Sequence, residues 1–314
     1  KGEHGVWDAE HPHVRLCVQS PWLLIRLGAP DRAKSAHTPR ALAHTNAGIP
    51  VRVAVPSRAH DLRLHHPTRM PTAPLPRRTL TLLLLALVAA AAVTYLPTLD
   101  NHLVYDDLST VQRNPLIASF SRIPAQFTSA MWDIVEPTDR HRVGYWRPLM
   151  NVALTFANVW GSGSARAFHL LSILLHAGAV CAAFALAWRL VKNVSIAFFA
   201  ALLFALHPVQ VESVAWVSSL NSMLFGMFAL FALERYLAWR ERGSKGAPWS
   251  AGACFLFALL SKELAIAVVP AVVVLEVARF LSGERAKDAP PTSFARSWLP
   301  YAPFAAAFVA YYVA

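Results

Sequence analysis

The chain has 314 residues, of which 55% are hydrophobic and 15% charged, with a formal net charge of +11 and a mean hydropathy of +0.39. A soluble domain typically contains about 45–50% apolar and about 25% charged residues, so the composition excludes an ordinary soluble protein. The basic residues cluster between apolar segments and in the N-terminal tail, which suits an anionic membrane surface. No basic stripe with interleaved aromatic residues is present, so we expect no nucleic-acid partner.

Residues 1–78 differ from the rest of the chain. They are rich in His, Pro and Arg and contain no apolar run long enough to cross a bilayer. We expect a disordered basic segment here, with Met70 as a candidate start of translation, because a short basic stretch and an apolar segment follow it directly. Residues 79–314 are the expected membrane domain, which we expect to continue beyond Ala314. The three cysteines lie far apart and predict no metal site and no disulfide framework.

A membrane-spanning helix needs about 20 mainly apolar residues. The chain contains seven candidate segments: Leu80–Leu96, Ala167–Val191, Ile196–Leu206, Met223–Leu237, Ala251–Leu260, Ala265–Leu281 and Trp298–Ala314. The sequence therefore predicts an all-α, polytopic transmembrane helical bundle. His169 and His176 lie on one face of the second segment, where we expect them to make interhelical hydrogen bonds.

The distribution of basic residues predicts the orientation of this bundle. Arg77 and Arg78 precede the first segment, so the positive-inside rule places its start in the cytoplasm. The later basic clusters lie in every second turn, at 189–192, 235–245 and 279–296. We therefore expect the first loop, 99–165, and the turns 207–219 and 261–263 on the non-cytoplasmic face.

The first loop is too long to be a simple connector. The spacing of apolar residues over Pro115–Met131 predicts one or two short interfacial helices, interrupted at Pro124. Tyr145–Trp160 carries aromatic residues and a second amphipathic pattern. A loop that doubles back along the membrane surface can roof a cavity there.

Asp106 and Asp107 are adjacent carboxylates that follow the first apolar segment. Two interpretations are open. The pair can cap the next short helix or lie in solvent. Alternatively, one carboxylate is the general base for transfer to a hydroxyl group.

Five blocks follow one another along the chain: VYDDLSTVQRNPLI, YWRPLMNVALTFAN, FHLLSILLHAGAV, ALLFALHPVQVESVAWVSS and LLSKELAIAVVPAVVVLE. Together they resemble the N-terminal membrane half of the GT-C glycosyltransferases with tetratricopeptide repeats, the protein O-mannosyltransferase-like family. The resemblance covers Thr79–Glu276. It implies a GT-C bundle that moves a sugar, with mannose expected, from a polyprenyl- or dolichyl-phosphate carrier to a hydroxyl acceptor, with protein Ser/Thr expected.

The resemblance also implies where the reaction takes place. The site is expected on the periplasmic or lumenal face, in a bacterial inner membrane or in the endoplasmic reticulum membrane. No cofactor is expected, with a divalent cation as the alternative. The family's acidic motif falls on Asp106 and Asp107, so one of them is the implied base, with Asp106 preferred.

A lipid-phosphate sugar brings its own leaving group, so the protein must deprotonate the acceptor and stabilise developing phosphate charge. Five further residues on the expected outer face are candidates for substrate binding: Arg147, His207, Glu212, Lys262 and Glu263. Lys262 and Arg147 are candidate phosphate ligands, whereas His207 and Glu212 are candidates for sugar or acceptor hydroxyls. The alternatives are a snorkelling Lys262 paired with Glu263, a solvent-facing Arg147, and a helix cap at His207 and Glu212.

The chain departs from the family in one turn. The family commonly has a Gly-Arg-Ala-Asp-like turn after the HPVQVESVAW block, but Ser218–Ser222 contains neither the Arg nor the acid. No tetratricopeptide pattern is present, so we expect such repeats beyond Ala314. A polytopic transporter or lipid flippase, and a catalytically inactive membrane scaffold of the same fold, are the competing functions.

Overall fold

The computed structural model describes residues 76–130, 145–243, 246–281 and 298–313. All of them lie in one compact unit, residues 68–314. The regular structure of these residues is helical, without a β-strand, which confirms the predicted all-α class. Of the expected disordered segment 1–78, residues 1–75 lie outside the described residues, as does most of the basic turn 279–296.

The first apolar segment forms α1 (Arg77–Tyr95), which continues as a 3-10 helix over Leu96–Asp100. The other longer helices are α3 (Pro148–Trp160), α4 (Ala165–Val191), α5 (Val194–Leu206), α7 (Leu220–Glu241), α8 (Trp249–Ser261), α9 (Val268–Leu281) and α12 (Ala302–Val313). Two short helices, α2 (Ile123–Gln126) and α6 (Val211–Ala215), lie in the connections. Each of the seven predicted apolar segments thus contains one of the longer helices.

Length and composition separate these helices into two groups. Four are long and apolar enough to cross a membrane: Arg77–Asp100, Ala165–Val191, Val217–Glu241 and Glu263–Leu281. α5 and the segment Pro208–Ala215 make a fifth when they are counted as one span, although the chain bends by 50° between them. α8 and α12 are apolar but shorter. Among the described residues, four or five of the seven predicted spans therefore have the length that a bilayer requires.

Local sequence explains the two turns that flank α5. α4 ends at Lys192, whose φ of 56° is left-handed, and the Asn193 side chain then accepts a hydrogen bond from the Ile196 N–H (3.1 Å). Asparagine is among the preferred residues at this capping position. α5 ends at His207 because Pro208 disfavours a helical conformation in the residue before it. The chain bends at this point and continues into α6.

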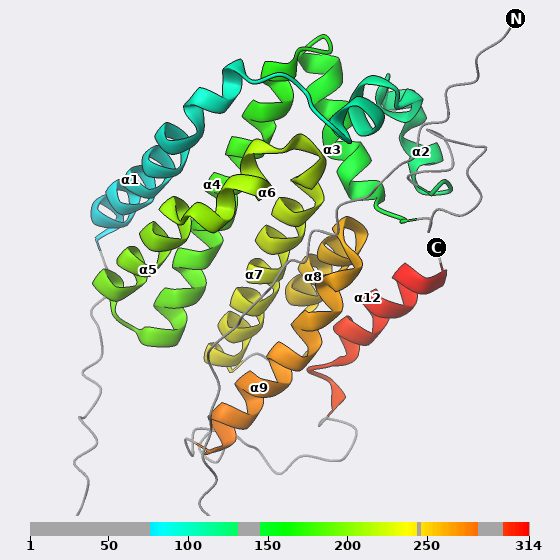
Figure 1. The fold of residues 1–314 in the computed structure, drawn as a ribbon. Coiled ribbons are helices and arrows are strands. Elements are labelled where there is room, and N and C mark those ends of the chain that lie inside the picture. Colours follow the sequence, from blue (N-terminus) through cyan, green and yellow to red (C-terminus); the bar gives the residue numbers. More distant parts are fainter. Residues whose placement is uncertain (1–75, 131–144, 244–245, 282–297, 314) are drawn as a thin grey trace, which may run out of the picture. The chain divides into compact units, whose positions relative to one another are not determined.

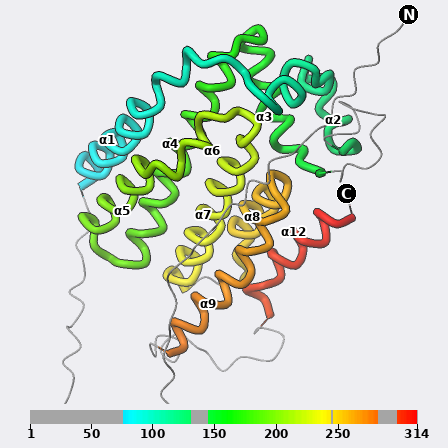
Figure 2. The backbone as a smooth tube through the Cα atoms, viewed as in Figure 1, coloured from blue at the N-terminus to red at the C-terminus, as the bar shows by residue number. Residues whose placement is uncertain are grey.

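α4 lies at the centre of the packing. It contacts α1, α5 and α7, while α7 in turn contacts α8 and α9 (Figures 1 and 2). Leu87 of α1, Phe184 of α4 and Ala201 of α5 are buried together, and small residues let such helices approach closely. The outer side of α1 stays apolar and exposed, with Leu82 66% exposed, which is typical of a helix surrounded by lipid.

The described part of the first loop is partly helical. It contains a π-helical turn over Leu108–Gln112, two 3-10 turns over Pro115–Ile117 and Phe120–Arg122, and α2. Pro124 does not interrupt a helix, because it lies in the first turn of α2. A proline costs no hydrogen bond there, since the first N–H groups of a helix have no intrahelical partner. Tyr145–Trp160 is helical from Pro148 onwards, as α3.

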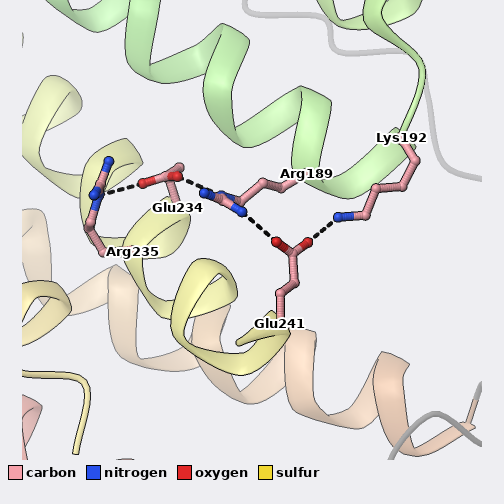
Figure 3. A network of polar contacts seen from close by, with 5 residues as sticks. All are labelled: Arg189, Lys192, Glu234, Arg235 and Glu241. Carbon is pink, nitrogen blue, oxygen red and sulfur yellow. Dashed lines mark hydrogen bonds and ion pairs between the residues drawn. The ribbon is translucent and has the colours of Figure 1, made fainter. Parts of the chain in front are cut away.

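The helices alternate in direction, so the first loop, α6 and the α8–α9 connection lie at one end of the bundle (Figure 1). The opposite end carries an ion network between α4 and α7 (Figure 3). Arg189 contacts Glu234 (2.5 Å) and Glu241, Lys192 also contacts Glu241, and Arg235 contacts Glu234 (2.6 Å). The described parts of the two predicted sets of turns therefore lie at opposite ends of the bundle (Figure 1).

The close approach of α8 and α12 yields a test of the packing. A Cβ added at Gly252 would lie 2.4 Å from the Pro303 Cβ and 2.9 Å from the Pro303 carbonyl oxygen. We expect Gly252→Ala to lower the free energy of unfolding by about 1–3 kcal/mol, because a ring and a backbone carbonyl cannot yield as a flexible side chain would. Thermal unfolding of the detergent-solubilised protein measures the loss.

Gly226→Ala in α7 is the matched control, since an added Cβ there has nothing within 4 Å. We expect this variant to be as stable as the parent or slightly more stable. Equal stability of the two alanine variants would contradict the close packing of α8 against α12.

Candidate functional site

The two adjacent aspartates face opposite environments. The backbone turns sharply at Tyr105, whose φ of 52° is left-handed, and the Asp107 N–H donates to the Val104 carbonyl oxygen (3.0 Å) to close the turn. Such a φ is unfavourable for an aromatic residue and persists only where its surroundings hold it. As a result Asp106 is exposed, whereas Asp107 is 1% exposed.

Asp107 joins the first loop to the start of α7. Its Oδ1 accepts hydrogen bonds from the Ser218 N–H (2.7 Å) and the Ser218 hydroxyl (2.6 Å), and its Oδ2 accepts one from the Val104 N–H (3.1 Å). Ser218 lies in the 3-10 turn that leads directly into α7, where free N–H groups favour a negative charge. Asp107 therefore makes no capping hydrogen bond to the helical turn that directly follows it, and instead caps the turn that leads into α7.

Asp106 lines a pocket of about 640 Å³ at the same end of the bundle. The other lining residues come from the first loop and from α6 with its flank: Asn101, Val104, Tyr105, Val211, Glu212, Ala215 and Trp216. The Trp216 indole N–H has no hydrogen-bond partner among the described residues. The pocket thus combines two carboxylates and one amide with aromatic and aliphatic walls. No residue of the 115–160 segment lines this pocket, whose second wall is formed by α6 and its flank.

A chain of polar side chains supports the turn from behind. Thr110 Oγ1 lies 2.8 Å from Ser218 Oγ, and Asn114 Nδ2 donates to the Thr110 carbonyl oxygen and to Asn151 Oδ1. Gln126 Nε2 extends the network to Thr155 (2.8 Å). These side chains are buried, and hydrogen bonds offset much of their desolvation cost, although Gln126 Oε1 has no partner among the described residues. The sequence predictions did not include this support. The signal that indicates it is the spacing of Asn151 and Thr155, one turn apart in an apolar helix.

His207 and Glu212 lie in different surroundings after the bend that ends α5. His207 Nδ1 accepts a hydrogen bond from the Val209 N–H (3.1 Å), so its ring caps the 3-10 turn over Pro208–Gln210. His207 is exposed and is not among the residues that line the pocket. Glu212 does line it. Of this predicted pair, only Glu212 thus lies where a bound molecule would touch it.

Arg147 and Glu263 pair with each other across 116 positions of sequence. The guanidinium donates to both carboxylate oxygens (3.3 and 2.8 Å) and lies 4.4 Å from the centre of the Tyr145 ring. The bidentate pair joins the start of α3 to the turn between α8 and α9. Arg147 is therefore not a solvent-facing turn residue, and the structure pairs Glu263 with Arg147 rather than with Lys262.

Lys262 is left without an ion-pair partner among the described residues. Its ammonium donates to the Ser222 hydroxyl (2.9 Å), which in turn donates to Asn221 Oδ1 (3.1 Å). Burial lowers the pKa of Lys262, and the charge of Arg147 lowers it further, against opposing contributions from Glu263 and Glu212. This cation can accept an anion at little cost, because its present partner is a neutral hydroxyl. The α8–α9 connection that carries Lys262 lies at the same end of the bundle as the pocket (Figure 1), although Lys262 does not line it.

The two histidines of α4 differ. His176 Nε2 lies 3.1 Å from the Ala205 carbonyl oxygen of α5, so the predicted interhelical hydrogen bond is confirmed there. His169 is 1% exposed, and neither of its ring nitrogens has a hydrogen-bond partner among the described residues. The same prediction is therefore wrong for His169, which lies near Asp107 and the backbone of Asn101.

Metal binding has no geometric support in the part of the chain that the structure describes. No group of three or more His, Cys, Asp or Glu side chains gathers there in a way that could hold an ion. The site does contain the exposed Asp106 carboxylate and the Glu212 carboxylate in one pocket, with Lys262 at the same end of the bundle (Figure 1). Such a set can accept a proton from a hydroxyl group and hold an anion.

Comparison with known proteins gives one group of relatives. The chain is 31% identical over 201 residues to Protein O-mannosyl-transferase Tmtc2 of Drosophila melanogaster, which is 62% of this chain and 21% of that protein. It is 25% identical over 197 residues to Protein O-mannosyl-transferase F38B6.6 of Caenorhabditis elegans and 27% over 196 residues to human Protein O-mannosyl-transferase TMTC3. The chain covers 28% and 21% of the lengths of these two relatives.

The other comparisons add nothing to this group, since no family model and no solved structure matches the chain. The similarity recurs in relatives from flies, a nematode, mouse and human. Its extent is about the same in each of them. Over about 60% of its length, the chain is homologous to the Tmtc protein O-mannosyl-transferases.

Proposed function

We propose that the protein is a membrane glycosyltransferase that moves a sugar from a polyprenyl- or dolichyl-phosphate carrier to a hydroxyl acceptor. The expected sugar is mannose and the expected acceptor is a protein Ser or Thr. The activity for which the relatives are named and the candidate membrane spans support this class of function. The observation that carries the proposal is the exposed Asp106 carboxylate in a ligand-sized pocket at the loop end of the bundle.

In this proposal Asp106 is the catalytic base. Its carboxylate takes the proton of the acceptor hydroxyl while the acceptor oxygen attacks the anomeric carbon of the sugar. The bond between that carbon and the phosphate oxygen breaks, and the electron pair leaves with the lipid phosphate. Asp107 acts as a positioning residue, because its three hydrogen bonds hold the turn on which Asp106 sits.

The lipid phosphate needs a cation at the membrane surface. We assign this role to Lys262, whose ammonium is bonded to a neutral hydroxyl and is partly desolvated. Arg147 contributes its charge from beside it, while Glu263 fixes the orientation of the guanidinium. The positive-inside pattern supports a site on the non-cytoplasmic face, lumenal in the endoplasmic reticulum or periplasmic in a bacterium.

Substitution of Asp106 tests the base. We expect Asp106→Asn to reduce sugar transfer by at least about 100-fold, because an amide cannot take the acceptor proton. The measurement is transfer of labelled mannose from dolichyl-phosphate mannose to serine peptides by membranes that contain the protein. Expression and thermal unfolding should match those of the parent. Transfer at the parental rate would rule out Asp106 as the base, and absence of transfer by the parent would contradict the proposed function.

Asp107→Asn should behave differently from Asp106→Asn. The amide NH₂ would face one of the three N–H or O–H donors that now point at the carboxylate, leaving a buried donor unpaired. We expect the free energy of unfolding to fall by about 1–3 kcal/mol. Thermal unfolding in detergent measures it. A loss of transfer without any loss of stability would instead indicate a direct catalytic role for Asp107.

The pH dependence of kcat/KM for the lipid donor tests Lys262. Because burial and Arg147 lower the pKa of Lys262, its ammonium loses the proton at a lower pH than an exposed lysine does, and kcat/KM should fall as pH rises through that value. Lys262→Arg, which keeps its charge, should move this alkaline fall to higher pH. Lys262→Met should raise KM for the donor about tenfold.

Lys192→Arg is the control for this measurement, since Lys192 lies at the opposite end of the bundle and pairs with Glu241. It should leave the pH profile unchanged. An alkaline fall that stays in place in Lys262→Arg would show that another group is responsible.

A further inference from the structure

The charge of the pocket differs from what a lipid-phosphate donor requires. Asp106 and Glu212 are both exposed and line the pocket together, and neither side chain forms a hydrogen bond or an ion pair with another described residue. No lysine or arginine is among the lining residues. Two carboxylates beside apolar walls concentrate negative potential in such a space. An anionic phosphate would therefore be repelled from it.

The cation suited to the donor phosphate lies outside this pocket. Lys262 does not line it, although its charge is coupled to that of Glu212. The lining of the pocket therefore carries only negative charge, and the positive side chain of Lys262 lies outside it. A cation is favoured in the pocket and an anion beside Lys262, so the two kinds of ligand bind at different places.

We propose, on the basis of the proposed function, that this pocket holds the acceptor polypeptide and selects segments with a Lys or Arg near the acceptor Ser or Thr. Asp106 faces the acceptor hydroxyl, and Glu212 pairs with the basic side chain. Val104, Val211 and Trp216 contact the apolar parts of the segment. In an extended peptide, residues two positions apart point to the same side, so the basic residue is expected two positions from the acceptor.

Matched peptides test this selection. Serine peptides that differ only in carrying Lys, Gln or Glu two positions from the acceptor are compared as substrates in membranes containing the protein and dolichyl-phosphate mannose. We expect kcat/KM to fall about fivefold from Lys to Gln and again from Gln to Glu. Glu212→Gln should remove most of this difference, and Glu212→Lys should reverse it. The preference of the parent should also weaken as salt is added.

Asp100→Asn is the matched control, since Asp100 is an exposed carboxylate in the same region that pairs with Arg166 and does not line the pocket. It should keep the parental preference. Equal use of the three peptides by the parent, a preference for Glu, or a preference that survives Glu212→Lys would each overturn the inference while leaving the proposed function intact.

Peptide binding tests the preference of the pocket for basic peptides independently of sugar transfer. Labelled peptides in which Ala replaces the acceptor Ser are titrated with the purified chain, and fluorescence anisotropy reports their affinity. If the parent transfers no sugar to any peptide, the proposed function fails, but these affinities still test the charge of the pocket. We expect the Lys peptide to bind about fivefold more tightly than the Gln peptide to the parent, and no more tightly to Glu212→Gln. Equal affinities of the three peptides for the parent would overturn the inference.

Discussion

The hydrogen bonds accepted by the Asp107 carboxylate join two segments that are 111 positions apart in the chain. They connect the turn after α1 to the turn that begins α7. Both of these helices also contact α4. A buried carboxylate needs several donors to offset the loss of water, and the backbone and hydroxyl of Ser218 supply two of them. This anchoring also explains why Asp106 is exposed. The hydrogen bonds hold Asp107 inward, and the same turn then directs the adjacent Asp106 outward.

The two ends of the bundle differ in which of their charged side chains have an ion-pair partner. At the end drawn in Figure 3, Glu234 and Glu241 each meet two cations, so the charges are neutralised where α4 and α7 meet. The loop end also holds the Arg147–Glu263 and Arg166–Asp100 pairs, but Asp106, Glu212 and Lys262 have no ion-pair partner there among the described residues. Paired charges fix helices relative to one another, whereas groups left without a counterion are available to a ligand.

The sequence predicted the helices well because long apolar runs and basic turns are local signals. It also placed Asp106, Glu212 and Lys262 at the same end. The preference for Asp106 over Asp107 came from the family resemblance alone, because their different environments depend on a left-handed residue and on Ser218, neither of which a pattern of adjacent acids reveals. The Arg147–Glu263 pair was missed for the same reason, since its members are 116 positions apart and meet only after the bundle assembles.

The bend of 50° at His207 and Pro208 has a consequence for access. A straight continuation of α5 would carry Glu212 and Trp216 onward along the direction of the span. The bend instead redirects the chain, so that residues of α6 and its flank form a wall of the pocket that Asp106 also lines. In the proposed reaction, a donor with a long hydrocarbon chain and an acceptor from the aqueous side would approach this end of the bundle from different directions. A single proline thus determines that Glu212 and Trp216 line a pocket with Asp106 instead of extending the span.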